Sequence, residues 1–337
     1  MVRRPRARSA DGQREVPLRS YEHFSSCDPL QDLILERIVA GASPRVYERC
    51  NEPVGEGVQA EARSVSKSAV SREFVRRTRS ALGELMSRRL DDVRLAALIV
   101  DGIELGERTH VVCLGITTEG VKVPLGLWEG STENATVARA LPSDLVDRGL
   151  DPEQGILFVI DGAKALRKAI RQVFGEPAPV QRCIRHKERN VLDHLREVVR
   201  RRLRAAWAEP DHGRALAREL DRSHPGAGAS LREGLSETVT VQRLGASERL
   251  RGTLGSTNPC ESMIEIVRRI QRNVKRWQDG DMRLRWTPAR MLEAERQFRR
   301  IIGYRDLARL AVTVEREVAA ATPPSQTKRE VATPVTV

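Results

Sequence analysis

Two uninterrupted apolar runs, each followed by an aspartate and a glycine, constrain the fold of this chain most strongly. The first run, residues 95–100, leads into Asp101 and Gly102, and the second, residues 156–160, leads into Asp161 and Gly162. Apolar runs of this length without polar alternation are typical of central strands buried on both faces. We therefore expect a buried sheet that carries a carboxylate at the end of two of its strands.

The flanking segments predict the order of the other elements. The turn Thr118-Glu119-Gly120 separates two strand-like segments and indicates a hairpin. Pro142 would kink or split the helix that contains it. Strands are expected at 95–100, 110–117, 121–128, 155–160 and 179–182, and helices at 133–148, from about Leu166 to Gly175, and at 184–207. This order is that of a ribonuclease-H-like fold, an α/β fold with a mixed sheet flanked by helices, in which a right-handed crossover makes Asp101 and Asp161 neighbours.

Composition and apolar periodicity divide the chain into six segments. The N-terminal region contains a helix that Ser66 would cap, and the Ser223-His224-Pro225-Gly226 stretch would interrupt the helices of an insertion. A last helix is expected at 288–301. The expected segments are a basic disordered arm (1–28), a helical region (29–92), the first part of the α/β core (93–196), an all-helical insertion (197–255), the C-terminal helices of the core (256–317) and a disordered tail (318–337).

The charge of the chain indicates a polyanionic partner. Its 58 Lys and Arg residues exceed 46 Asp and Glu residues, which gives a formal net charge of +12 and a pI near 10.1. Such a surplus favours nucleic-acid binding through phosphate neutralisation. No apolar run approaches the roughly 20 residues that span a bilayer, and five scattered cysteines without a CxxC pair argue against disulfides. We expect a cytoplasmic protein.

Carboxylates at strand ends suit metal-dependent phosphodiester chemistry. Two Mg²⁺ ions need several carboxylate oxygens on fixed backbone, which Asp101, Asp161 and Glu261 would supply. Each Asp-Gly pair is also a common turn. Glu261 follows Asn258 by three residues, so it could instead complete a capping box with Asn258 as N-cap. The residues alone leave both interpretations of Glu261 open.

Basic and polar groups on three predicted helices are candidate DNA contacts. For each set there is an alternative to DNA binding: the residues could form a solvated helix face or i,i+4 ion pairs. Cys183 and His186 are zinc-ligand types, but no second pair stands nearby, so a phosphate-facing patch around them is favoured. The candidates are Lys67, Ser68, Ser71 and Arg72, presented as in a helix-turn-helix; Arg182, Arg185, Lys187 and Arg189; and Arg268, Arg272, Lys275 and Arg276.

The chain resembles the Mutator-like family of DDE transposases of bacterial insertion sequences, from about residue 29 to 312. The resemblance rests on Val100-Asp101-Gly102, on Gly149-Leu150 leading into Phe158-Val159-Ile160-Asp161-Gly162, on Gln181-Arg182-Cys183-Ile184-Arg185-His186-Lys187 with Arg189-Asn190-Val191, and on Ser256-Thr257-Asn258-Pro259-Cys260-Glu261.

This resemblance implies a transposase that binds the terminal inverted repeats of an insertion sequence and performs strand cleavage and strand transfer. It assigns Asp101, Asp161 and Glu261 as catalytic residues and ligands of Mg²⁺, with Mn²⁺ as a substitute. It makes Cys183 and His186 a signature near the active site, and residues 58–75 part of the repeat-binding region. The implied partners are repeat-end and target double-stranded DNA and further copies of the chain on nucleoid DNA, without a membrane. Two alternatives remain. The chain could be a ribonuclease-H-like nuclease or resolvase without strand transfer, or it could be a DNA-binding remnant that represses transposition.

Overall fold

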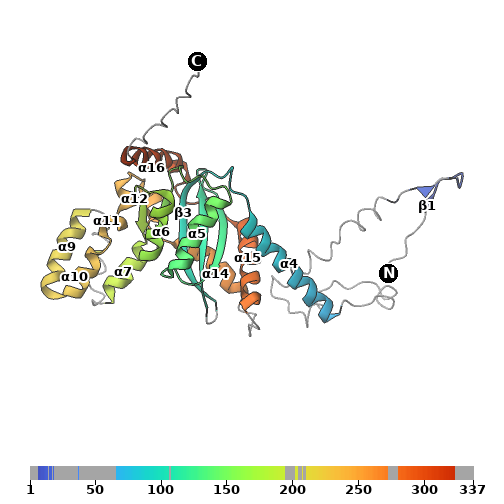
Figure 1. The fold of residues 1–337 in the computed structure, drawn as a ribbon, viewed down its shortest axis with the longest axis horizontal. Coiled ribbons are helices and arrows are strands. Elements are labelled where there is room, and N and C mark those ends of the chain that lie inside the picture. Colours follow the sequence, from blue (N-terminus) through green and yellow to red (C-terminus); the bar gives the residue numbers. More distant parts are fainter. Residues whose placement is uncertain are drawn as a thin grey trace, which may run out of the picture. The chain divides into compact units, whose positions relative to one another are not determined.

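The computed structural model describes residues 7–13, 15–16, 18, 37, 66–105, 108–193, 202–203, 207, 210–271 and 280–322 (Figure 1). The chain divides into two compact units. The smaller comprises Met1–Glu84 with Ile266–Arg290, and the larger comprises Leu85–Glu265 with Met291–Val337.

The larger unit is built on a five-stranded mixed sheet. Its strands follow the order β5-β4-β3-β6-β7, with β3, β4 and β5 antiparallel and β6 and β7 parallel to β3. All five strands expected from the sequence are present, and β3 continues beyond its apolar run, through Asp101. The strands are β3 (Leu95–Leu105), β4 (Arg108–Thr117), β5 (Lys122–Glu129), β6 (Leu157–Ile160) and β7 (Val180–Arg182).

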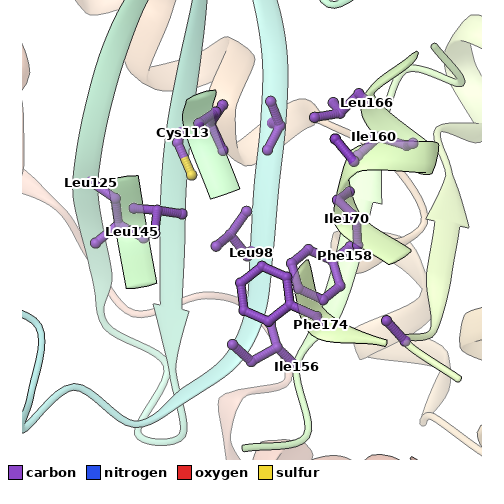
Figure 2. Close-up of a cluster of buried hydrophobic side chains, with 14 of the residues drawn as sticks. Leu98, Cys113, Leu125, Leu145, Ile156, Phe158, Ile160, Leu166, Ile170 and Phe174 are labelled. Carbon is purple, nitrogen blue, oxygen red and sulfur yellow. The ribbon is translucent and has the colours of Figure 1, made fainter. Parts of the chain in front are cut away.

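Two helices, α5 (Ala135–Asp147) and α6 (Lys164–Phe174), pack on this sheet through the main apolar core. Figure 2 shows Leu145 of α5 and Ile170 of α6 beside Leu98 of β3. Helix α5 is continuous, so the expectation that Pro142 would split it is wrong. Tertiary burial of the residues around Pro142 stabilises the helix, and packing of an apolar face decides helix formation more than local propensity does.

The predicted insertion is helical and has a small core of its own. Trp207, Leu216, Leu220 and Leu231 form this core together with Val191 of α7. The predicted interruption is confirmed, because α9 ends at Ser223 and α10 begins at Pro225. The helices are α7 (Ile184–Leu192), α9 (Pro210–Ser223), α10 (Pro225–Arg232), α11 (Leu235–Thr238), α12 (Thr240–Arg243) and α13 (Glu248–Leu254).

Three longer helices complete the chain: α14 (Asn258–Gln271), α15 (Gly280–Gln297) and α16 (Leu307–Ala321). Helix α15 begins earlier than the helix expected at 288–301. Helix α16 packs against β3 and extends into the segment expected to be a disordered tail. Its buried residues Leu307, Leu310, Ala311 and Val314 recur at helical spacing. Across the described ranges, no helix combines the length and apolarity needed to cross a membrane.

In the smaller unit, α4 (Lys67–Ser87) begins at the predicted cap, because the hydroxyl of Ser66 accepts a hydrogen bond from the N–H of Ala69 at 3.2 Å. Phe74 of α4 is buried and packs on Trp286, with ring centroids 4.6 Å apart. Two short strands, β1 (Ala7–Arg8) and β2 (Glu15–Val16), pair within the arm that was expected to lack structure. Leu30, Leu33, Ile34 and Ile38 recur at helical spacing, and the helix that they predict lies almost wholly outside the described residues.

Candidate active site

Asp101 and Asp161 directly follow the last residue pair of two parallel strands. Val100 of β3 pairs with Ile160 of β6, and each aspartate is the next residue along its strand. Asp101 still lies inside β3, because it pairs with Val112 of β4. The interpretation of Asp101 as a turn residue is therefore wrong. Its backbone is fixed by the sheet, as a metal ligand requires.

Asp161 ends β6 and shapes the turn that follows. Its Oδ1 accepts a hydrogen bond from the N–H of Ala163 at 2.9 Å, and its Oδ2 accepts one from the hydroxyl of Thr132 at 2.7 Å. Gly162 has a φ of +112°, which favours glycine. The interpretation of Asp161 as a turn residue is therefore confirmed, and this geometry leaves its functional role a prediction. Sequence reasoning missed Thr132, because the loop before α5 carries no motif that connects it to residue 161.

Glu261 lies in the first turn of α14, but not as half of a capping box. The helix begins at Asn258 itself, and the carbonyl of Thr257 accepts the N–H of Glu261 at 2.9 Å. The N–H of Asn258, which a capping box would pair with Glu261, donates to the hydroxyl of Ser256 at 3.4 Å. The expectation of Asn258 as N-cap is wrong by one residue. The Glu261 side chain is exposed to solvent.

Asp161 and Glu261 are both close enough to Asp101 for their charges to influence it. Asp101 is only 4 % exposed, and this burial raises its pKa to about 7, with the charges of Asp161 and Glu261 acting in the same direction and His186 opposing them. Within the described ranges, no three His, Cys, Asp or Glu side chains converge closely enough to hold a metal ion. The described residues thus place three carboxylates near Asp101 of β3 and the end of β6, without a closed ligand cage.

Cys183 and His186 lie beside these acids. Cys183 is the N-cap of α7 and is fully buried. Burial raises its pKa, yet hydrogen bonding to His186 and Thr257 outweighs burial and leaves the pKa lowered. The Cys183 sulfur also raises the pKa of His186 to about 9 against the effect of burial, with Asp101 and Asp161 adding to the shift. The charges of Asp101 and Asp161 therefore favour the protonated form of the nearby His186 imidazole.

Two of the predicted basic contacts line a hollow beside Glu261. Arg185 and Arg189 are exposed one turn apart on α7. The hollow has a volume of about 380 Å³, and its walls are formed by Arg185, Arg189, Asn258, Glu261, Ser262 and Glu265. Because guanidinium groups bind phosphate oxygens in a forked geometry, this hollow combines an acid with two groups suited to a DNA backbone.

Arg182 and Lys187 differ from the surface position that the sequence suggested. Arg182 is 7 % exposed and Lys187 is completely buried. The Arg182 guanidinium donates to the carbonyl of Glu233 at 3.2 Å, and the Glu233 carboxylate lies 3.8 Å from Arg182 and 3.9 Å from Lys187. The face of α7 that carries Lys187 is covered by the insertion, so neither side chain contacts solvent as a phosphate ligand would.

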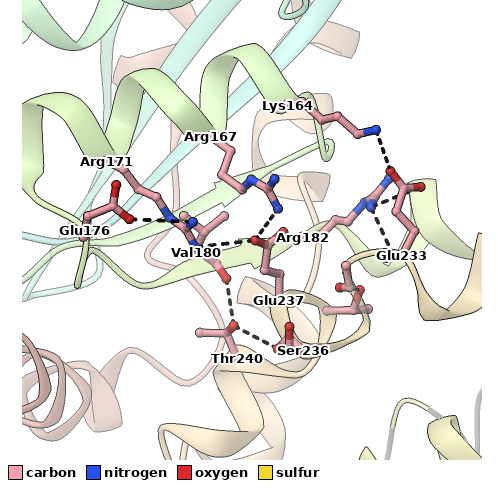
Figure 3. Close-up of polar contacts among 12 residues, drawn as sticks. Lys164, Arg167, Arg171, Glu176, Val180, Arg182, Glu233, Ser236, Glu237 and Thr240 are labelled. Carbon is pink, nitrogen blue, oxygen red and sulfur yellow. Dashed lines mark hydrogen bonds and ion pairs between the residues drawn. The ribbon is translucent and has the colours of Figure 1, made fainter. Parts of the chain in front are cut away.

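Figure 3 shows that Glu233 and Glu237 attach the insertion to α6 and β7. Glu233 also pairs with Lys164 at 3.4 Å, and Glu237 pairs with Arg167 at 2.7 Å. The hydroxyl of Thr240 donates to the carbonyl of Val180 in β7 at 2.7 Å. The cations that follow Asp161 on α6 therefore bind the insertion.

The other predicted DNA contacts fall outside this site or outside the described residues. Lys67, Ser68, Ser71 and Arg72 are exposed on one face of α4, whereas Val70 and Phe74 are buried. Arg268 is exposed on α14. Arg272, Lys275 and Arg276 lie outside the described residues.

Comparison with known proteins gives two matches. Residues 18–300 match the family described as "Transposase, Mutator family". The chain is also 28 % identical over 195 residues to a "Probable transposase for insertion sequence element" from Corynebacterium diphtheriae, an alignment that covers 55 % of each protein, so the chain spans about half the length of that curated relative. The family match covers most of the chain and includes Asp101, Asp161 and Glu261. The chain belongs to the Mutator family of transposases.

Proposed function

We propose that the chain is a DDE transposase that binds the inverted repeats of an insertion sequence and catalyses metal-dependent strand cleavage and strand transfer. One observation carries this proposal: the parallel pair Val100 and Ile160 brings Asp101 and Asp161 together, and the charge of Glu261 reaches Asp101. Carboxylates contributed by three separate elements near the end of β6 suit in-line displacement at phosphorus.

The sheet supports assignment to the ribonuclease-H-like fold. Its strand order, three antiparallel strands followed by two parallel strands reached through helices, is the order expected from the sequence. The all-helical segment lies between α7, which follows β7, and α14, which carries Glu261. The chain therefore has the element order of a catalytic domain whose last acid follows a helical insertion.

Asp101, Asp161 and Glu261 would hold Mg²⁺, or Mn²⁺ in its place. The donor set fits, because hard divalent cations prefer carboxylate oxygens, and Asp101 and Asp161 are anchored by the sheet and by Thr132. The exposed Glu261 side chain can reorient toward them. Bound metal would supply electrostatic stabilisation of the attacking and leaving oxygens.

The protein groups would orient the DNA for this reaction. Arg185 and Arg189 would hold backbone phosphates beside Glu261, and the cationic His186 would offset the negative charge that gathers at Asp101 and Asp161. In the smaller unit, Lys67, Ser68, Ser71 and Arg72 present donors suited to repeat-end DNA. The proposed partners are repeat-end and target duplexes, bound by more than one copy of the chain.

The test compares wild type with Asp161→Asn on a labelled repeat-end duplex in Mg²⁺. We expect Asp161→Asn to bind the duplex with the wild-type Kd while cleavage falls by at least about 10³-fold, the scale of losing a catalytic group. Asp211→Asn, an exposed aspartate of α9, is the matched control and should cleave normally. Undiminished cleavage by Asp161→Asn would overturn the mechanism.

A second substrate separates the alternatives. A pre-cleaved repeat end with a free 3′-hydroxyl is offered together with target DNA. A transposase joins the two, whereas a nuclease or resolvase leaves them separate. A DNA-binding remnant gives neither cleavage nor joining, yet retains steeply salt-dependent binding.

A further inference from the structure

A single buried residue connects the strand that carries Asp161 with the helix that carries Glu261. The backbone N–H of Cys183 donates to the carbonyl of Ile160 at 2.7 Å, directly before Asp161. The Cys183 sulfur accepts two hydrogen bonds from Thr257, one from its N–H at 3.4 Å and one from its hydroxyl at 3.5 Å. Both distances are within the range of sulfur acceptors, whose radius is larger than that of oxygen.

Thr257 in turn contacts Glu261. Thr257 is completely buried, and its carbonyl accepts the N–H of Glu261 at 2.9 Å. A second contact holds the same stretch, since the N–H of Ile184 donates to the carbonyl of Gly255 at 2.9 Å. The start of α14 is thus held against the start of α7 by the Cys183 sulfur and by this backbone hydrogen bond.

The sulfur of Cys183 has a different environment from those of the other buried cysteines in the described residues. Burial raises the pKa of both Cys113 and Cys260. Cys183 alone of the three receives donors from Thr257 and interacts with His186. A cysteine that only filled space in a core would need neither contact, so packing does not account for this arrangement.

We propose that Cys183 is a positioning residue for Glu261, acting through Thr257 to set the first turn of α14 against Asp101 in β3 and Asp161 after β6. The inference rests on the proposed role of Glu261 as a metal ligand. Groups that orient metal ligands without touching the metal typically contribute 10- to 100-fold to metal affinity or activity.

The functional test uses four variants: Cys183→Ala, Cys183→Ser, Thr257→Val and the double variant Cys183→Ala/Thr257→Val. For each we measure single-turnover cleavage of repeat-end DNA against Mg²⁺ concentration. We expect Cys183→Ala to raise the half-saturating Mg²⁺ concentration by about 10-fold or more, with an unchanged Kd for the DNA. Cys183→Ser retains an acceptor and should recover part of the loss. The double variant should be no worse than Cys183→Ala, because both changes break the same contact.

A second readout requires neither metal nor activity. Amide hydrogen exchange of metal-free protein reports how firmly the first turn of α14 is held. We expect Cys183→Ala to speed exchange across residues 257–262 by about 10-fold, while the amides of β4 keep their wild-type rates. Cys113→Ala is the matched control, since it removes another fully buried sulfur, from β4. It should lower the melting temperature without changing exchange at 257–262 or the Mg²⁺ dependence.

The two readouts distinguish failure of the inference from failure of the proposed function. If Cys183→Ala lowers only the melting temperature, as Cys113→Ala does, then Cys183 is a packing residue and the inference is overturned. If wild type itself fails to cleave, the proposed function falls, and hydrogen exchange alone decides whether Cys183 orients α14. Unchanged exchange at 257–262 in Cys183→Ala overturns the inference in either case.

Discussion

Asp101 and Asp161 stand at the same position of two neighbouring parallel strands, each one residue beyond the pair formed by Val100 and Ile160. The first is held within β3 by its pairing with Val112, while the second turns the chain out of the sheet. This places a rigid buried carboxyl beside a partly exposed one. Holding two carboxylates of like charge close together lowers the free energy of unfolding, and such a cost is common where a residue is selected for function rather than for folding.

Asp101→Asn should therefore stabilise the metal-free protein. The folded-state pKa of Asp101 is about 7, raised from 3.8 chiefly by burial. The folded state holds the proton more tightly than the unfolded state, so wild type loses stability as pH rises from 3.8 to 7. Asparagine does not titrate, and above pH 7 the variant should gain about 1 to 3 kcal/mol in free energy of unfolding. Urea denaturation with a chelator, at pH 4.5 and at pH 8, measures this difference.

The control for this prediction is Asp92→Asn, which changes an exposed carboxyl in the turn before β3. It should leave the pH profile of unfolding unchanged. Equal profiles for wild type and Asp101→Asn would show that the Asp101 carboxyl is not destabilised in the folded state.

Gly162→Ala should destabilise the protein through two independent effects. Gly162 has a φ of +112°, and an added Cβ would collide with the Nε of Arg182. Such backbone strain costs about 1 to 3 kcal/mol, and displacing Arg182 would also disturb its contact with Glu233. Thermal unfolding of Gly162→Ala should show a melting temperature several degrees lower.

Gly252→Ala is the matched substitution, and it should change the stability of the protein in the opposite direction. Gly252 lies in α13, with no atom within 4 Å of an added Cβ. Alanine there should stabilise the helix by about 0.5 to 1 kcal/mol. A loss of stability in both variants would argue against the conformational explanation for Gly162.

Lys187 should make the free energy of unfolding increase with pH in the alkaline range. Burial lowers its pKa from 10.5 to about 8, the charge of Arg182 adds to this, and Glu233 and Glu237 oppose it. Between pH 8 and 10.5 the unfolded state binds the proton more tightly, so this group makes the protein more stable as pH rises through that window. Lys187→Met should remove this dependence and raise the free energy of unfolding at pH 7 by about 1 to 3 kcal/mol. Chemical denaturation from pH 7 to 10 provides the measurement, and an unchanged slope would contradict it.

The strands and the meeting of Asp101 with Asp161 were predictable, because apolar runs and crossover handedness are properties of local sequence and of topology. The continuation of β3 through Asp101 was not, since Asp101-Gly102 has the composition of a turn and only pairing with β4 overrides it. The expectation that Pro142 would split α5 was wrong for the same reason, because burial of the residues around it outweighs the tendency of proline to break a helix.

The surroundings of the site were less predictable than its acids. The sequence placed Arg182 and Lys187 with Arg185 and Arg189 in one basic cluster, but it contains no information on which helix face the insertion covers. The bonds from Thr257 to the Cys183 sulfur and from Thr132 to Asp161 join residues far apart in the chain. No short-range pattern encodes such contacts.

The difference within this basic cluster gives a prediction about DNA binding. Arg185 and Arg189 are exposed beside Glu261, so Arg185→Ala and Arg189→Ala should each weaken DNA binding and lower the slope of log K against log salt by about 1, because one phosphate contact is lost. Arg316→Ala is the charge-matched control. Arg316 is exposed on α16. Its neighbour Glu315 pairs at 2.9 Å with Arg94, which precedes the first residue of β3, so Arg316 lies near the end of the strand that is farther from Asp101.

Arg182→Ala should behave differently from both. Arg182 is buried and donates to the carbonyl of Glu233, so its loss should lower the free energy of unfolding by about 1 to 3 kcal/mol, the scale of losing a hydrogen bond from a buried charged group. Folded Arg182→Ala protein should retain the salt slope of wild type. Fluorescence anisotropy with a repeat-end duplex at five salt concentrations measures the slopes. A reduced slope for Arg182→Ala, with none for Arg185→Ala, would show that burial does not determine which arginines of this cluster contact the DNA backbone.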